Sequence, residues 1–92
     1  MIRLNCSLIL EVSENRKPLI ETAMELIELS LREKGCIDYD FYVSLTNDDR
    51  YEIVETWKSQ KDLNDHKASE HFLRLVPKLQ SLATVTIEQF DF

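Results

Sequence analysis

Residues 36–57, CIDYDFYVSLTNDDRYEIVETW, decide the fold that this sequence predicts. Apolar and polar side chains alternate along residues 36–45 and again from Tyr51 to Trp57. A period of two residues is typical of a β-strand with one buried face. The intervening residues 46–50, TNDDR, favour a turn. The stretch therefore predicts an antiparallel β-hairpin.

The same alternation occurs near both ends of the chain. Residues 2–12 and residues 84–92 alternate, so each is expected to form a further strand. Between the first strand and the hairpin, apolar side chains recur every three to four residues, which predicts a helix over residues 16–34. Gly35, the only glycine in the chain, stands where such a helix would end in a left-handed residue.

The segment after the hairpin is expected to be helical in two pieces. Ser59 and Ser69 are each placed to cap the N-terminus of a helix. Pro77 falls inside the second piece and is expected to bend it, because proline removes one intrahelical hydrogen bond. The complete order is strand, helix, strand, strand, helix, strand. It predicts an α+β, ferredoxin-like βαββαβ fold with both helical segments on one face of the sheet.

Two helical segments can cover only one face of a four-stranded sheet. We expect the other face to keep exposed apolar side chains, and an exposed apolar surface of that size predicts a partner. The simplest partner is a second copy of the chain. The sequence therefore predicts a homodimer that pairs two sheets, a dimeric α+β barrel.

The composition is that of one small domain over residues 1–92, and it narrows the choice of partners. Lys and Arg number 11 and Asp and Glu 17, so the net charge is −6. This charge argues against nucleic acid, which is bound by basic side chains that neutralise phosphates, and against anionic membranes. No apolar run approaches the roughly 18 residues that span a bilayer. The charge is compatible with a neutral or apolar small-molecule partner, or with simple solubility.

The N-terminal residues make a cytoplasmic location the default expectation, and the cysteines are interpreted in that setting. Residues 1–10, MIRLNCSLIL, lack the unbroken apolar core and the cleavage site of a secretory signal. Cys6 and Cys36 lie far apart in the sequence. We interpret both as small buried hydrophobes rather than as a disulfide or a metal-binding pair.

The only tryptophan and both histidines of the chain lie within residues 57–71. Trp57 is either a core aromatic or a pocket wall that stacks on a flat ligand. His66, on the inward side of a helix, is either a hydrogen-bonded structural residue or a group that takes and gives a proton. His71 and Phe72 follow across the helix break, where they cap, pack or contact a substrate. Because the histidines are five residues apart and no acid or cysteine stands at a recognised ligand spacing, we expect no metal.

Four residues on the expected strands complete the candidates. Asn5 is either solvated or offers its amide to a ligand, since asparagine is disfavoured in strands. Tyr39 and Tyr51 either pack in the sheet or contact a substrate. Glu55 either orients a histidine or is exposed. A single glycine cannot build a phosphate-binding loop, and no spacing indicates a nucleophilic triad.

An ordered set of motifs in this chain resembles the antibiotic biosynthesis monooxygenase family. The resemblance covers essentially the whole chain and is carried by EKGCIDYDFY at 33–42 and YEIVETWKSQKDLNDHKASEHF at 51–72. The matching residues are, in chain order, Gly35, Cys36, Tyr39, Glu55, Trp57, His66, Ser69, His71 and Phe72. Asn5 matches an asparagine on the first strand of several oxygenase members.

The resemblance implies a dimeric α+β barrel and one of three activities. They are cofactor-independent oxygenation of quinols or polycyclic aromatics, haem degradation, and isomerisation of a small phosphorylated signalling sugar. The iron-ligating histidine of the haem-degrading branch would fall near Val76, and valine cannot ligate iron. With His66 where that branch usually has a tryptophan, the resemblance points to the quinol-oxygenase and isomerase side of the family, in which the oxygenases need no cofactor.

The leading hypothesis is a monooxygenase that oxidises a quinol or polycyclic aromatic molecule with O2. In it the catalytic residues are His66 as acid or base, Trp57 as stacking wall and Asn5 as donor to an oxyanion. The substrate-contacting residues are Tyr39, Tyr51, His71 and Phe72. The alternatives are an isomerase or lyase for a small carbonyl or phosphorylated metabolite, and a small-molecule-binding module without catalysis.

Overall fold

The computed structural model describes residues 1–92 and has the α+β, ferredoxin-like architecture that the sequence predicts. The elements, in chain order, are β1 (Ile2–Ile9), a 3-10 turn η1 (Ser13–Asn15), α1 (Arg16–Ser30), β2 (Cys36–Val43), β3 (Arg50–Trp57), α2 (Gln60–Lys67), α3 (Glu70–Leu82) and β4 (Thr84–Asp91). None of the helices has the length and hydrophobicity that crossing a lipid bilayer requires.

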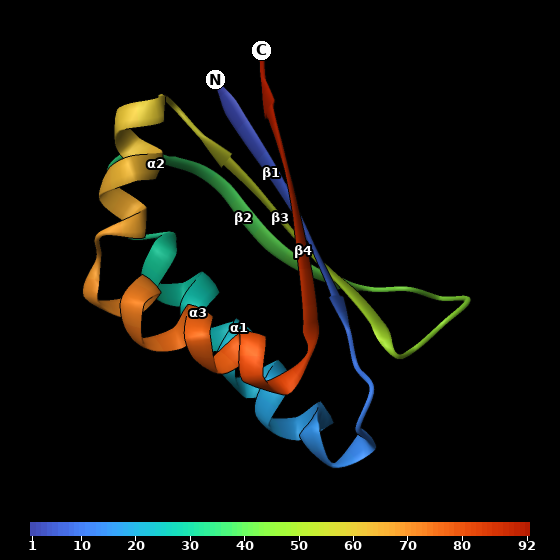
Figure 1. Ribbon diagram of the computed structural model, residues 1–92. Helices are drawn as coiled ribbons and strands as arrows, with labels where there is room; N and C mark the ends of the chain where they lie inside the picture. The colour runs from blue at the N-terminus through green and yellow to red at the C-terminus, as the bar shows by residue number, and fades with distance from the viewer.

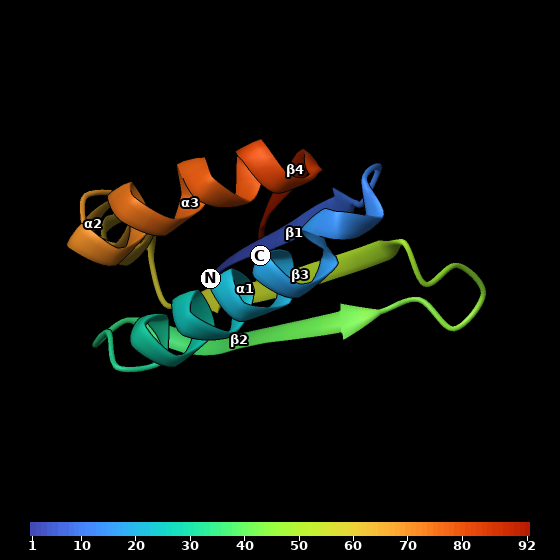
Figure 2. The same ribbon diagram turned by 90° about the horizontal axis from the view of Figure 1, so that it is seen from below.

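The four strands form one antiparallel sheet in the order β2-β3-β1-β4. All helices lie on one side of it, with α1 and α3 next to each other (Figures 1 and 2). The chain ends are neighbours, because β1 and β4 pair along their whole lengths (Figure 1). The backbone N–H of Phe92 donates to the carbonyl of Met1 at 2.9 Å.

The core lies between the sheet and the pair α1 and α3. On β1 every second residue is buried, which explains the alternation read from the sequence; these residues are Ile2, Leu4, Cys6 and Leu8. On β3 every second residue is likewise buried and faces the helices; these residues are Tyr51, Ile53, Glu55 and Trp57. The helices add Leu19, Leu26, Leu75 and Leu79. One acidic residue, Glu55, is therefore part of an otherwise apolar row.

The two helix caps predicted after the hairpin are confirmed. The Ser59 hydroxyl accepts from the backbone N–H of Asp62 at the start of α2, and the Ser69 hydroxyl accepts from that of Phe72 at the start of α3. These side-chain acceptors satisfy backbone donors that have no partner within the helix. The break between α2 and α3 places His66 in a last helical turn and His71 in a first one.

The prediction that α1 runs to residue 34 and ends on a left-handed Gly35 is wrong. The helix ends at Ser30, residues 31–35 form a turn, and no residue of the chain has a positive φ. Gly35 is required for space instead: a Cβ built there would lie 2.1 Å from the Cγ and 2.2 Å from the Cβ of Asp62. The start of α2 can therefore approach this turn closely.

The expectation of an apolar open face is also wrong. On β1 the face away from the helices presents Arg3, Asn5 and Ser7, which pair in register with Thr56, Val54 and Glu52 of β3. Polar groups dominate this face because the apolar row of each strand already points toward the helices. Phe90, which pairs with Arg3, is the exposed aromatic side chain of this face at the edge strand. Further exposed apolar side chains lie elsewhere; they include Ile87, Phe92, Val43 and Leu45.

Candidate functional site

The side chain of Glu55 lies on the helix-covered face of β3 and is only 4% exposed. Its Oε1 accepts a hydrogen bond from Nε1 of Trp57 at 2.8 Å, and its Oε2 accepts one from the thiol of Cys6 at 3.7 Å. Tyr39 pairs with Glu55 in register on the neighbouring strand β2 and is also buried. Donors from two strands, β1 and β3, thus hold one buried carboxyl group in place.

The pKa of Glu55 is raised, and burial is the main cause, since desolvation disfavours the charged form. The hydrogen bonds from Trp57, Tyr39 and Cys6 oppose this effect, while the charge of Glu33 adds to it. A carboxyl group with a raised pKa can exchange a proton with a ligand near neutral pH more readily than an exposed one. Glu55 is therefore equipped for acid–base chemistry.

Glu55 lines an apolar cavity of about 100 Å³ between the sheet, α1 and α3. Of its 15 lining residues 11 are hydrophobic, and Glu55 is the only acidic one. Tyr39 and Phe72 also line it, and Lys67 is the only basic residue that does. A mostly apolar cavity with a few convergent polar groups is the usual form of a small-molecule site.

Behind Glu55 lie the two rings that the sequence singled out. Trp57 is fully buried and His66 is 1% exposed, and their ring centroids are 4.4 Å apart. The Nε2 atom of His66 is 4.0 Å from Oε1 of Glu55, which is beyond hydrogen-bond distance. Neither ring lines the cavity. Trp57 therefore supports the carboxyl group from its protein side, and His66 packs against the Trp57 ring.

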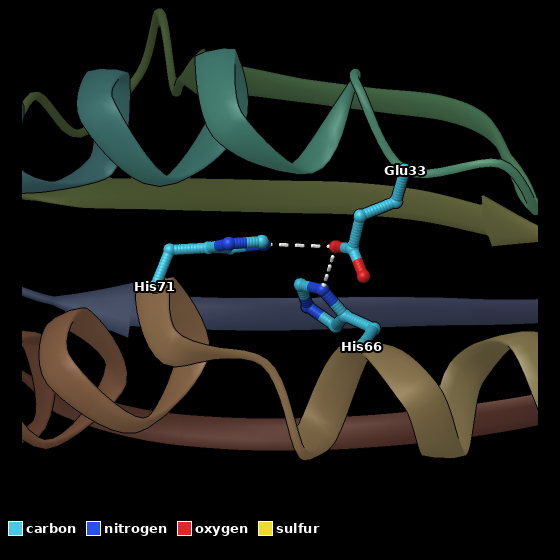
Figure 3. Close-up of side chains that lie close together, drawn as sticks. All are labelled: Glu33, His66 and His71. Atoms are coloured by element: carbon cyan, nitrogen blue, oxygen red, sulfur yellow. Dashed lines mark hydrogen bonds and ion pairs between the residues drawn. The ribbon is translucent and has the colours of Figure 1, made fainter.

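Glu33 joins the two histidines from the turn after α1 (Figure 3). Its Oε2 atom lies 2.5 Å from Nδ1 of His66 and 2.9 Å from Nε2 of His71. A carboxylate at Nδ1 favours the tautomer of His66 that carries its proton there, which leaves Nε2 facing Glu55. Burial lowers the pKa of His66 although Glu33 opposes the shift, so the imidazole is held neutral.

The three ligand-type atoms of Glu33, His66 and His71 all lie within 4.8 Å of one another. They are the residues of this chain with the geometry to hold a metal ion. The sequence spacing did not reveal this set, because Glu33 is distant in the chain and reaches the histidines only through the fold.

The structure brings together five of the seven predicted site residues. Tyr39 and Phe72 line the cavity, Trp57 and His66 lie behind it, and His71 contacts Glu33. His66 links these groups, since its ring also lies 5.7 Å from Tyr39 and 5.1 Å from Phe72, measured between centroids.

The other two lie apart from this group. Tyr51 is buried toward the hairpin end, where its hydroxyl accepts from Arg16 at 2.6 Å and its ring stacks on Phe41. Asn5 lies on the open face between Val54 and Glu88 of the neighbouring strands. The sheet separates Asn5 from Glu55.

The sequence left open whether Glu55 orients a histidine or is exposed, and it did not single out Glu33. The alternation along β3 indicated the position of Glu55, because its side chain points to the same face as those of the buried Ile53 and Trp57. Glu33 had no signal, because a glutamate in a polar turn normally faces solvent. Neither cysteine is activated: burial raises the pKa of both thiols, that of Cys36 to about 11.

Fold and cavity together define a ferredoxin-like domain with a buried carboxyl group that lines an apolar cavity. A family model, that of the antibiotic biosynthesis monooxygenases, matches residues 12–78, and the chain belongs to this family. A crystal structure of a Bacteroides thetaiotaomicron protein of unknown function, described as a possible oxidoreductase, has a TM-score of 0.95 at 41% identity; 99% of this chain and 96% of that one are covered.

Two further relatives match this chain over different shares of their own length. A crystal structure named antibiotic biosynthesis monooxygenase has a TM-score of 0.90 at 26% identity, covering 100% of this chain and 98% of the other. The uncharacterized protein sll1783 of Synechocystis sp. is 30% identical over 69 residues, which are 75% of this chain. The match spans only 47%, about half, of that longer relative.

Proposed function

We propose that the protein is a monooxygenase that oxidises an electron-rich aromatic molecule, a quinol or a polycyclic aromatic, with O2. Membership of the family supports the reaction class. The single observation that carries the proposal is the carboxyl group of Glu55, which has a raised pKa and lines an apolar cavity. Removing a proton from such a substrate makes it electron-rich enough to reduce O2.

For an anthrone-type polycyclic substrate, the proposed reaction converts a ring CH2 group and O2 into a carbonyl group and water. The Glu55 carboxylate removes one proton from the CH2 group. The resulting carbanion transfers electrons to O2, and a C–O bond forms to give a hydroperoxide. The second C–H proton is then lost and the O–O bond breaks. Glu55 returns the proton, and water is released. One oxygen atom ends in the product and the other in water, and all electrons come from the substrate.

The residues around Glu55 have supporting roles in this proposal. Tyr39 is the candidate donor to a developing oxyanion, since it lines the cavity together with Glu55. Trp57 positions the carboxyl group from behind, His66 packs against Trp57, and neither ring stacks on the substrate. We no longer assign the oxyanion to Asn5, because it lies across the sheet.

The size of the cavity limits how a substrate binds. Its volume of about 100 Å³ is below the roughly 300–1,000 Å³ that is common for ligand sites. An aromatic substrate therefore has to displace part of the wall. Phe72 is the candidate, because it is only half-buried and lies in the first turn of α3.

Oxygen consumption tests this proposal. Protein treated with chelator is mixed with a panel of quinols and anthrones, and O2 uptake is measured together with ¹⁸O incorporation from ¹⁸O2. We expect one labelled atom per product and loss of turnover in Glu55→Gln. Glu52→Gln is the matched control, since Glu52 is on the same strand and points to the open face. Wild-type protein without uptake, or full activity in Glu55→Gln, would refute the proposal.

A second candidate is an isomerase or lyase for a small carbonyl metabolite. The small volume of the cavity favours it, because such a molecule fits without displacing Phe72. The same Glu55 would move a proton between carbon atoms without consuming oxygen. Turnover under strictly anaerobic conditions separates this candidate from the oxygenase. Ligand-dependent thermal shifts without any product would favour a binding module.

We also propose that the chain forms a homodimer. Exposed apolar side chains on the edge strand β4 and at the residue after it support a dimer: Ile87, Phe90 and Phe92 are about half exposed or more. A second copy is the simplest cover for them. Sedimentation equilibrium measures the mass directly, and Phe90→Asp is expected to shift it toward the monomer. A monomeric wild type at high concentration would contradict the proposal.

A further inference from the structure

We propose that Glu33, His66 and His71 bind a divalent transition-metal ion such as Zn²⁺. The three residues come from separate segments, the turn after α1, the last turn of α2 and the first turn of α3 (Figure 3). Their side chains converge on one point, with the potential ligand atoms within 4.8 Å of one another. The proposal is independent of the oxygenase chemistry above, which needs no ion.

The distances are close to those that a metal site requires. Two ligands bound to zinc at roughly 2.0–2.1 Å with a tetrahedral angle lie roughly 3.3–3.4 Å apart. The Oε2 atom of Glu33 is now 2.5 Å from Nδ1 of His66 and 2.9 Å from Nε2 of His71. Each of these two distances has to lengthen by less than about 1 Å to make room for the ion. Glu33 can move by this amount, because its side chain extends from a turn rather than from a helix.

The ligand chemistry selects the kind of ion. Two imidazoles and one carboxylate suit zinc, copper, nickel or cobalt, whereas calcium and magnesium prefer a set of oxygen ligands. The single negative charge of Glu33 offsets part of the charge of the ion. Three protein ligands leave a fourth tetrahedral position for water.

The surroundings of the cluster also fit a metal site. The side chain of His66 is 1% exposed and forms the inner part, whereas those of His71 and Glu33 are 14% and 18% exposed and leave an entry path. Ligation through Nδ1 would move the His66 proton to Nε2, which faces Oε1 of Glu55 at 4.0 Å. Metal-bound histidines usually direct their other ring nitrogen to a carboxylate in this way. The ion would therefore be linked through His66 to the cavity.

The first test is the stoichiometry of binding. The full-length protein, without a tag and stripped with chelator, is dialysed against Zn²⁺, and bound zinc is measured by mass spectrometry. We expect one ion per chain. Glu33→Gln and His71→Ala are expected to weaken binding by more than about tenfold, since even partners outside the ligand shell are worth about 10–100-fold. Glu70→Gln is the matched control, because this neighbouring carboxylate binds Arg74 and not the cluster.

The second test uses Trp57, the only tryptophan, as a reporter of where the ion binds. Its ring lies 4.4 Å from that of His66, so Cu²⁺ or Co²⁺ in the cluster is expected to quench its fluorescence with an endpoint at one equivalent. His71→Ala should abolish this quenching and Glu70→Gln should keep it. The test does not depend on activity, so its failure leaves the oxygenase proposal standing.

Three outcomes would overturn the metal site. They are a wild type that binds less than one ion per chain, zinc binding that is unchanged in both ligand variants, and quenching by Cu²⁺ that persists in His71→Ala. Circular dichroism verifies that each variant is folded, and His71→Gln replaces His71→Ala if the latter is not. The wild-type measurements decide the question even if every variant at the cluster unfolds.

Discussion

Replacement of Gly35 tests how the turn after α1 meets α2. A Cβ at position 35 would lie 2.1 Å from the Cγ of Asp62 and 2.2 Å from its Cβ, whereas ordinary contacts are at 3.4 Å or more. Rotation of the Asp62 side chain removes the first clash but not the second, since Cβ is fixed to the backbone. The turn or α2 must therefore move by about 1 Å. Overpacking of this kind costs about 1–3 kcal/mol in the free energy of unfolding.

The assay is urea denaturation of Gly35→Ala and Gly35→Asn followed by Trp57 fluorescence. A left-handed Gly35 would tolerate asparagine better than alanine, because asparagine enters that region more easily. The steric explanation predicts the reverse: asparagine costs at least as much as alanine. It also predicts that Asp62→Gly partly compensates Gly35→Ala in a double-mutant cycle. An alanine variant within about 0.5 kcal/mol of the wild type, or additive effects in the cycle, would refute the reasoning.

Three other predictions concern the site. The raised pKa of Glu55 lets the folded state keep a proton that the unfolded state releases above the ordinary pKa of 4.5. The free energy of unfolding should therefore fall as pH rises past 4.5. Glu55→Gln should remove this loss in urea titrations from pH 4 to pH 8. Because the pKa of His66 is lowered from 6.5, the unfolded state binds a proton at a higher pH than the folded state does. The free energy of unfolding should therefore decrease as pH falls below 6.5, and the same pH dependence in His66→Gln would contradict this. Phe72→Ala should cost about 2 kcal/mol, less than the loss of a fully buried ring, and should tighten binding of a two-ring aromatic in calorimetry; weaker binding would argue against Phe72 as the wall.

The strands and helix caps could be predicted because their causes are local. Alternation along β3 reflects which side of the strand each residue faces, and Ser59 and Ser69 act on backbone groups three residues away. The parity of the first strand even placed Asn5 on the face opposite Cys6. That placement already conflicted with its assignment to a site beneath the helices.

The rest of the site could not be predicted because it depends on contacts between distant segments. Gly35 looked like a helix cap, and its need for space arises only when α2 packs on the turn. Glu33 reaches His66 and His71 across 33 and 38 residues of sequence. The depth of Glu55 was readable from parity alone, but its cavity is formed by α3 and β4 as well.

The neighbouring chain ends have a practical consequence for engineering. Residues 1 and 92 are joined by backbone hydrogen bonds, so a short Gly-Ser linker could connect them without spanning any part of the molecule. New ends could then be opened at Leu45, which is fully exposed in the loop between β2 and β3. Such a circular permutant keeps every strand pairing of the sheet, and it moves both termini to the far end of the molecule from α2, leaving the edge beside Met1 free of a tag.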